Sequence, residues 1–180
     1  MVEASAGSKI VVAESGNKRK AITNEDVMQC IKDLSGWFET NAADYFNSKL
    51  KVCQGAASAE VATVLGEFGA GNSMLGVALQ KYNGSLQYQD TYIGLSLSEI
   101  SGHSGLKDKS VVPFAKDVDG TLLCLQIKDG KESVVMWDAD AGEVEQDLKV
   151  SYGEYIESIR EKLLTRKLMY EDGLGLVEVA

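Results

Sequence analysis

The chain has 180 residues, a net charge of -9 at pH 7, and apolar and charged fractions of 44% and 25%. This length suits one domain with its own hydrophobic core. The negative charge argues against a nucleic-acid binder, since phosphate contacts need a basic surface. It suits a basic protein partner, or serves solubility alone. No apolar run of about 20 residues is present that could cross a membrane, and we expect no membrane contact.

Residues 1–22 are rich in Ser, Gly, Ala and charged residues, which predicts a loose N-terminal arm without the features of a signal peptide. The basic cluster 18–20 is a weak nuclear-localisation signal. We therefore expect a cytoplasmic protein, with a nuclear location as the alternative. Cys30, Cys53 and Cys124 lie far apart without CxxC spacing, which favours reduced thiols.

Three helices are predicted in the first half of the domain. The first has Asn24 as its N-cap and apolar residues at helical spacing over 27–38. The second covers 56–68 and the third 75–81. The glycine-rich stretch between the second and third has neither GxGxxG nor Gly-Lys-Ser/Thr spacing, which argues against a nucleotide-binding loop.

The middle of the chain predicts short elements. Tyr82-Asn83-Gly84 ends the third helix, because Asn and Gly adopt the left-handed conformation easily. Two short strands are expected between 86 and 97, followed by a helical turn at 98–100. The polar segment 101–110 holds the only histidine, His103, and is expected to be a mobile loop.

Residues 111–137 form three apolar runs divided by Asp119-Gly120 and Asp129-Gly130. Asp-Gly between apolar runs is a strong hairpin signal, so we expect an antiparallel meander. The middle run, 122–127, is largely apolar on both faces. It is therefore covered on both faces, or covered on one and open to a partner on the other. Pro113 near the start of the first run fits an edge position.

The last part of the domain begins with five acidic residues within 138–147, which we interpret as a solvated loop. Ser151 and Glu154 then fit a capping box that starts a final helix. The tail 171–180 either adds an edge strand or stays loose. Together these elements predict a single α+β domain over 23–170, with an antiparallel or mixed sheet and flanking helices.

Short motifs for metals and catalysis do not fit this sequence. Asp117, Asp119 and Gly120 resemble the start of a calcium loop, but Gln126 stands where a bidentate Glu is required. One histidine excludes most Ser/His/Asp and two-histidine metal arrangements. Catalysis by carboxylates alone stays open. We expect no metal, no cofactor and no enzymatic activity.

Several motifs stand in an order that resembles the SUKH superfamily, which includes a fungal cell-wall-synthesis regulator and many bacterial toxin-immunity proteins. They are the acidic helix at 60–66, Lys81-Tyr82-Asn83-Gly84, the segment LSLSEI at 95–100, VPFA at 112–115 with Asp119-Gly120, and the closing helix at 151–164. The resemblance covers residues 56–164. It implies an α+β fold, no catalysis and a role in protein binding, either as a regulator or adaptor or as an immunity protein.

The leading hypothesis is a non-enzymatic regulatory or adaptor protein that binds a basic partner protein through its sheet face and acidic rim. The candidate partner-binding residues are Tyr82, Asn83, Asp117, Asp119, Trp137, Asp138, Asp140, Glu143 and Glu145. Trp137 fits the core equally well. The alternatives are an immunity protein that sequesters a basic toxin domain, a carboxylate-based enzyme or small-ligand binder, and a structural subunit whose sheet face is buried in a homodimer. A monomer and a homodimer are both compatible with the sequence.

Overall fold

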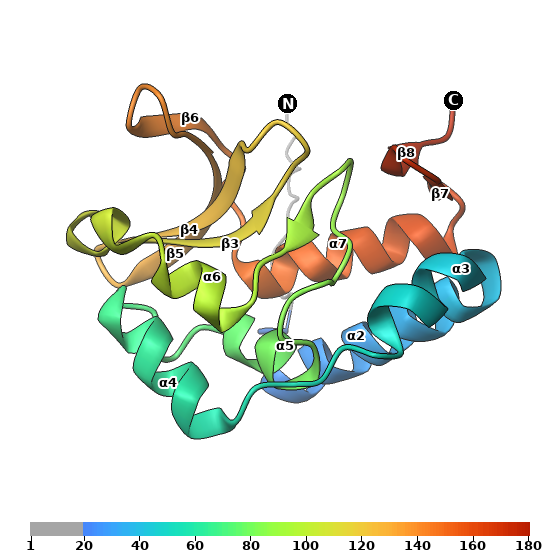
Figure 1. Ribbon diagram of the computed structural model, residues 1–180, viewed down its shortest axis with the longest axis horizontal. Coiled ribbons are helices and arrows are strands. Elements are labelled where there is room, and N and C mark those ends of the chain that lie inside the picture. The colour runs from blue at the N-terminus through green and yellow to red at the C-terminus, as the bar shows by residue number, and fades with distance from the viewer. Residues whose placement is uncertain (1–19) are drawn as a thin grey trace, which may run out of the picture.

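The computed structural model describes residues 20–180 and confirms the predicted α+β fold. Five antiparallel strands form the main sheet, two strands form a separate small sheet, and helices pack beside them (Figure 1). The predicted N-terminal arm covers residues 1–22, and its residues 1–19 lie outside the described residues. The basic cluster 18–20, apart from Lys20, is among them.

The helices are α2 (Asn24–Asn41), α3 (Ala43–Tyr45), the π-helix η3 (Phe46–Leu50), α4 (Ser58–Glu67), α5 (Leu75–Lys81), α6 (Leu97–Ser101), the 3-10 helix η4 (Ser104–Lys109) and α7 (Tyr152–Leu164). The strands are β2 (Ile93–Gly94), β3 (Val111–Lys116), β4 (Leu122–Lys128), β5 (Lys131–Asp138), β6 (Glu143–Asp147), β7 (Leu168–Glu171) and β8 (Gly175–Glu178). The three helices predicted in the first half of the domain are therefore present, as is the helix after Ser151.

The N-cap of α2 is Thr23, so the prediction of Asn24 was wrong by one residue. The Asp26 amide donates to Thr23 Oγ1 over 3.2 Å, and the Thr23 amide donates to Asp26 Oδ2 over 2.9 Å. This capping box needs an acceptor side chain three residues after the cap. Asp26 supplies it for Thr23, whereas the residue three after Asn24 is Val27.

Helix α7 lies between α2 and the main sheet (Figure 1). Its Arg160 Nη1 donates to Asp33 Oδ2 of α2 over 2.9 Å, and the Cys30 thiol of α2 donates to the Ile156 carbonyl oxygen over 3.3 Å. Ser151 and Glu154 form the predicted capping box at the start of α7. The two longest helices are thus joined by polar contacts as well as by apolar packing.

The main sheet has the order β2-β3-β4-β5-β6, and its β3, β4 and β5 form the predicted meander. In the β4–β5 turn, Asp129 and Gly130 have φ angles of 53° and 75°. Positive φ at both positions is what the two-residue hairpin turn requires. The side chains from Leu122 to Leu125 are all buried, so the first half of β4 is covered on both faces.

Three segments differ from their predictions. Residues 143–147, interpreted as a solvated loop, form β6, because pairing with β5 supplies backbone hydrogen bonds that the acidic side chains do not prevent. The predicted loop 101–110 contains η4, held to α4 by an ion pair of 2.8 Å between Lys107 and Glu67. The tail contributes β8, which pairs with β7 in the small sheet and is not a strand of the main sheet.

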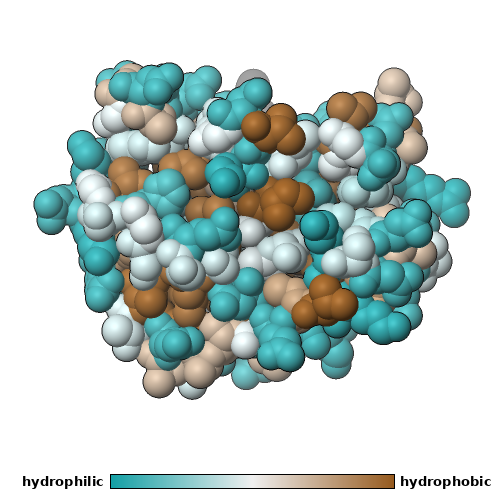
Figure 2. Space-filling view, in the orientation of Figure 1, coloured by the Kyte–Doolittle hydropathy of each residue, from teal (hydrophilic) through white to brown (hydrophobic). Residues whose placement is uncertain are grey.

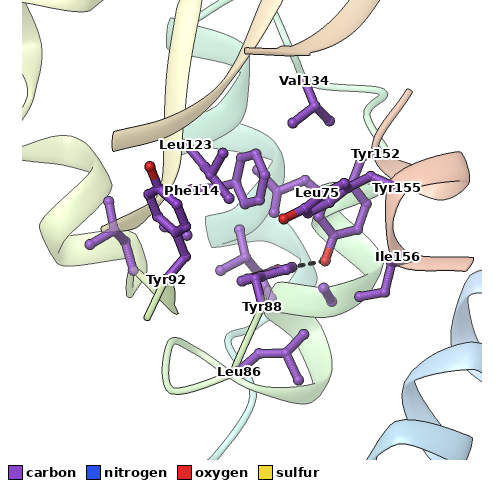
Figure 3. Packing of buried hydrophobic residues seen from close by; sticks show 14 of the residues in the cluster. Leu75, Leu86, Tyr88, Tyr92, Phe114, Leu123, Val134, Tyr152, Tyr155 and Ile156 are labelled. Carbon is purple, nitrogen blue, oxygen red and sulfur yellow. Dashed lines mark hydrogen bonds between the residues drawn. The ribbon is translucent and has the colours of Figure 1, made fainter. Parts of the chain in front are cut away.

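Four aromatic rings pack where α7 meets the sheet (Figure 3). The Phe114 ring centroid lies 5.2 Å from that of Tyr88 and 5.5 Å from that of Tyr152, and Tyr155 completes the cluster. The Tyr88 and Tyr152 hydroxyl groups share a hydrogen bond of 2.7 Å. This cluster fixes the segment that follows Tyr88 against both the helix and the sheet.

Candidate functional site

Two strands of the main sheet each carry one extra residue, and both bulges lie in the same row across the sheet. In β3 the extra residue is Phe114, beside the pairing partner of Leu123. In β6 it is Glu145, beside the pairing partner of Met136. Leu123 and Met136 pair with each other, so the two bulges flank them from opposite sides. A bulge changes the direction of a side chain and is frequent beside functional sites.

A groove of about 310 Å³ lies between this row and α7. Leu123, Met136 and Leu148 supply apolar surface to it, and Tyr92 and Tyr155 line it with their rings. We call this hollow, defined by these five residues, the Tyr92 groove. Its volume is at the lower end of the range of about 300–1,000 Å³ that is usual for ligand pockets, which is enough for one side chain or a small molecule.

The phenol of Tyr92 lies close to three carboxylates. Burial is the largest cause that raises its pKa to about 12, and the charges of Asp117, Glu145 and Asp90 raise it further. Negative charges disfavour the phenolate. Glu145 and Asp117, two of the predicted site residues, therefore both act on the Tyr92 phenol, although only Asp90 of the three carboxylates lines the groove itself.

Asp90 is held at the groove by its backbone. The Asp90 amide donates to the Leu176 carbonyl oxygen over 2.7 Å, and the Leu176 amide donates back over 3.0 Å. Partial burial, and then the charge of Glu178, raise the pKa of Asp90, whereas Lys162 lowers it. Lys162 also lines the groove, and its Nζ atom lies 3.6 Å from Glu178 Oε2.

Two predicted site residues are parts of the core. Trp137 is 5% exposed, and the Nζ atom of Lys109 lies 6.0 Å from its ring centroid. Tyr82 is 7% exposed, and its hydroxyl group shares a hydrogen bond of 2.7 Å with Ser35 Oγ. The core alternative for Trp137 is confirmed, and neither ring offers a free surface to a partner.

Three further predicted residues stabilise or occupy local turns. Asn83 Oδ1 accepts from the Leu97 amide over 2.8 Å at the start of α6. Asp117 Oδ1 accepts from the amides of Asp119 and Thr121 over 2.9 and 2.8 Å. Asn83 and Asp117 also line a second hollow of about 310 Å³ beside β2, while Asp119 is exposed in the β3–β4 turn.

The remaining four predicted residues lie on the β5–β6 hairpin, and we call them the acidic edge: Asp138, Asp140, Glu143 and Glu145. All but Asp138 are exposed. Asp138 Oδ1 accepts from the Asp140 amide over 2.9 Å, which shapes the turn. Asp138 and Glu143 are direct cross-strand partners, a like-charge pair that disfavours the hairpin unless a cation is near.

The sequence reasoning missed Asp90, Tyr92 and Tyr155 as site residues. Asp90 and Tyr92 looked like parts of a turn and a short strand, and Tyr155 looked like one position of an apolar helical stripe. The only signal for them was composition, because four tyrosines fall in the two segments that meet at the groove. Their meeting depends on packing between segments 64 residues apart along the chain.

Other features of the described part of the chain give no specific chemistry. A hollow of about 560 Å³ lies between α2 and α5, with Met28 and Val77 in its wall. Within residues 20–180, His, Cys, Asp and Glu side chains form no group of three or more that could hold a metal ion. Among the same residues, no helix combines the length and apolar character needed to cross a bilayer.

Comparisons with known proteins give no family for this chain. A scan against models of protein families and a search of curated proteins each found no match.

Proposed function

We propose that this protein is a non-enzymatic regulatory or adaptor protein of the cytoplasm or nucleus that binds a basic partner through the acidic edge. The resemblance to SUKH proteins, which carries the expectation of protein binding, is part of this proposal. The observation that carries it is an edge strand that gathers several exposed carboxylates. None of the four acidic-edge carboxylates forms an ion pair with another residue of the described part of the chain.

The geometry of β6 supports this role. Its outer edge has no strand partner in the described part of the chain, so its backbone amide and carbonyl groups are open to an added strand. The acidic side chains beside that edge disfavour pairing with a second acidic copy and favour a basic segment. Because the first half of β4 is buried on both faces, the sheet face there is not open to a partner. We therefore place the proposed interface at the β6 edge instead of the sheet face.

The proposal is tested by affinity capture from native cell lysate with two charge-matched variants. The test variant is D138N/D140N/E143Q/E145Q, in which the amide side chain introduced at position 138 can still accept the turn hydrogen bonds. The control is E39Q/D44N/E161Q/E171Q, which removes four exposed carboxylates from α2, α3, α7 and β7. The small sheet and α3 lie at the opposite end of the molecule from β6 (Figure 1).

We expect a partner to be retained by the wild-type protein and the control and lost by the test variant. With the purified partner, association of the test variant should be slowed by about tenfold at low salt, as is typical when electrostatic steering is removed. Equal capture and equal salt dependence of both variants would refute the acidic edge. A basic toxin-like partner would favour the immunity alternative, which uses the same surface.

A small-ligand binder or carboxylate enzyme is the second candidate function, because Asp90 and the Tyr92 phenol converge on one groove. Its groove volume would admit a small molecule. Absence of any captured partner, together with saturable binding of a small amine at the groove, would favour this candidate.

A further inference from the structure

We propose that the Tyr92 groove receives one long basic side chain, lysine or arginine, from the partner protein. This inference rests on the proposed function and makes it more specific: the acidic edge attracts a basic partner, and the groove beside Glu145 anchors one of its side chains. Three independent features of the groove support this assignment, namely its phenol oxygens, its charges and its apolar floor.

The first feature is the phenol of Tyr92, a residue of the groove wall. Tyr92 is only 6% exposed, and its hydroxyl has no hydrogen-bond partner among residues 20–180, whereas those of Tyr45, Tyr82, Tyr88 and Tyr152 all have one. In the described part of the chain, Arg160 Nε is the one fully buried side-chain nitrogen or oxygen that has no partner. The Tyr92 hydroxyl has no partner there either, so it is not fully buried. A ligand in the groove can therefore donate to the Tyr92 oxygen and satisfy it.

Tyr155 adds a second phenol to the same wall. It is 9% exposed, and burial raises its pKa, opposed by a hydrogen bond with the Gln89 backbone. Both phenols are thus held neutral. Neutral phenol oxygens accept hydrogen bonds, and their rings attract cations over their faces.

The second feature is the charge around the groove. Asp90 and Glu154 line the groove, and the charges of Asp117, Glu145 and Asp90 raise the pKa of Tyr92. The opposing cation, Lys162, is engaged by Glu178 and by Gln89 Oε1, at 3.6 and 3.4 Å. The carboxylates around Tyr92 outnumber this lysine, which favours a positive ligand over an anionic one.

The third feature is the floor. Leu123, Met136 and Leu148 contribute apolar surface to a groove that Asp90 and Lys162 also line. Lysine and arginine bury their methylene chains on such surface while the charged head stays polar. Figure 2 shows hydrophobic residues on the viewed face as separate patches among hydrophilic ones. A ligand that combines an alkyl chain with a cationic head matches this groove better than a wholly apolar one.

The test uses NMR titration of the full chain with blocked pentapeptides, Gly-Gly-X-Gly-Gly, in which X is Lys, Arg, norleucine or citrulline. We expect the Lys and Arg peptides to shift the Met136 and Leu123 methyl signals and the Tyr92 ring signals saturably. The neutral peptides should not. E145Q should weaken binding of the Lys and Arg peptides by about threefold, as expected when one nearby exposed negative charge is removed.

Two variants serve as controls. E39Q removes an exposed carboxylate of α2 that belongs to neither the groove nor the acidic edge, and should leave peptide binding unchanged. Y92F removes only a hydroxyl that has no partner among the described residues, so the fold should persist while binding weakens by about fivefold. Shifts confined to the β5–β6 hairpin, or equal effects of E39Q and E145Q, would overturn the groove assignment. Butylammonium bound more tightly than either peptide would overturn it in favour of a small amine ligand.

The anchor and the acidic edge fail in different ways. If D138N/D140N/E143Q loses the captured partner while E145Q and Y92F keep it at full affinity, the proposed function stands and the anchor is wrong. If E145Q and Y92F alone weaken the partner complex, the anchor is supported. If peptides bind the groove but no variant affects capture, the groove is not the partner's anchor.

Discussion

Replacing either Tyr88 or Tyr152 by Phe should destabilise the protein more than replacing both. Their hydroxyl groups share a hydrogen bond of 2.7 Å, and the two residues are 2% and 0% exposed. Removing one hydroxyl therefore leaves the other buried without this partner. Removing both leaves two Phe rings in a site already packed by Phe114, whose ring centroid lies 5.2 and 5.5 Å from theirs.

The size of the expected loss in unfolding free energy depends on whether one buried hydroxyl is left without its hydrogen-bond partner or both hydroxyls are removed. An unsatisfied buried hydroxyl costs about 1–3 kcal/mol, whereas replacing both partners by apolar groups of the same shape is nearly neutral. We expect each single variant, Y88F or Y152F, to lose about 2 kcal/mol of unfolding free energy and the double variant about 1 kcal/mol. The coupling energy between the two sites is then about 3 kcal/mol, at the upper end for residues in contact.

The assay is urea unfolding of the wild-type protein, both single variants and the double variant, followed by far-UV circular dichroism. Equal slopes of free energy against urea would show that the variants change stability and not the compactness of either state. Losses that add in the double variant would refute the reasoning, because the two hydroxyls would then act independently. Single variants as stable as the wild type would refute it as well.

Four further predictions concern single side chains. Thiol reagents should label half-buried Cys53 in the folded protein and the buried thiols only after unfolding. Burial raises the pKa of Cys30 from 9.0 to about 12. The contribution of the neutral Cys30 thiol to stability is therefore fully present below pH 9 and is lost as the pH rises towards 12, which urea unfolding at each pH measures. S151A should cost about 1 kcal/mol of unfolding free energy through the lost N-cap. G175A should cost more than about 1 kcal/mol, because its φ is +76° and a Cβ atom would lie 1.9 Å from the Asp90 carbonyl oxygen; stability equal to the wild type would contradict either prediction.

Elements whose signals are local could be predicted from the sequence. The meander followed from two Asp-Gly pairs, and α7 from Ser151 and Glu154, because in each case a few adjacent residues satisfy their own backbone groups. Helix α5 (Leu75–Lys81) was predicted with its observed bounds for the same reason. Such signals do not depend on the rest of the fold.

Strand β6 could not be predicted, because its residues do not alternate between apolar and polar. Only Val144 and Gln146 among its members are uncharged, and the sequence looks like a solvated acidic segment. Its strand conformation comes from pairing with β5, and the extra residue Glu145 is visible only in that register. The acidic character of this stretch was predicted; the direction of its side chains was not.

The two aromatic candidates, Trp137 and Tyr82, were predicted as binding residues but are buried in the core. Trp137 lies near the end of β5, beside Lys109 of η4, and Tyr82 follows α5 and bonds to Ser35 of α2. Each covering element lies more than 20 residues away in the sequence. An aromatic residue beside polar neighbours has the same local pattern in a core and at an interface, so the choice between them needed the tertiary structure.

The groove depends on the whole fold. The bulge at Phe114 lets its ring join the cluster that fixes Tyr88, and the bulge at Glu145 brings a carboxylate near Tyr92, while the Leu176 backbone in β8 holds Asp90 beside the groove. These residues come from separate segments of the chain. In the sequence, the local pattern of each segment indicated only a turn, a strand or a tail. A bulge lengthens one strand without helping its pairing, so two bulges that flank the same row of one sheet are better explained by the groove beside that row than by the stability of the sheet.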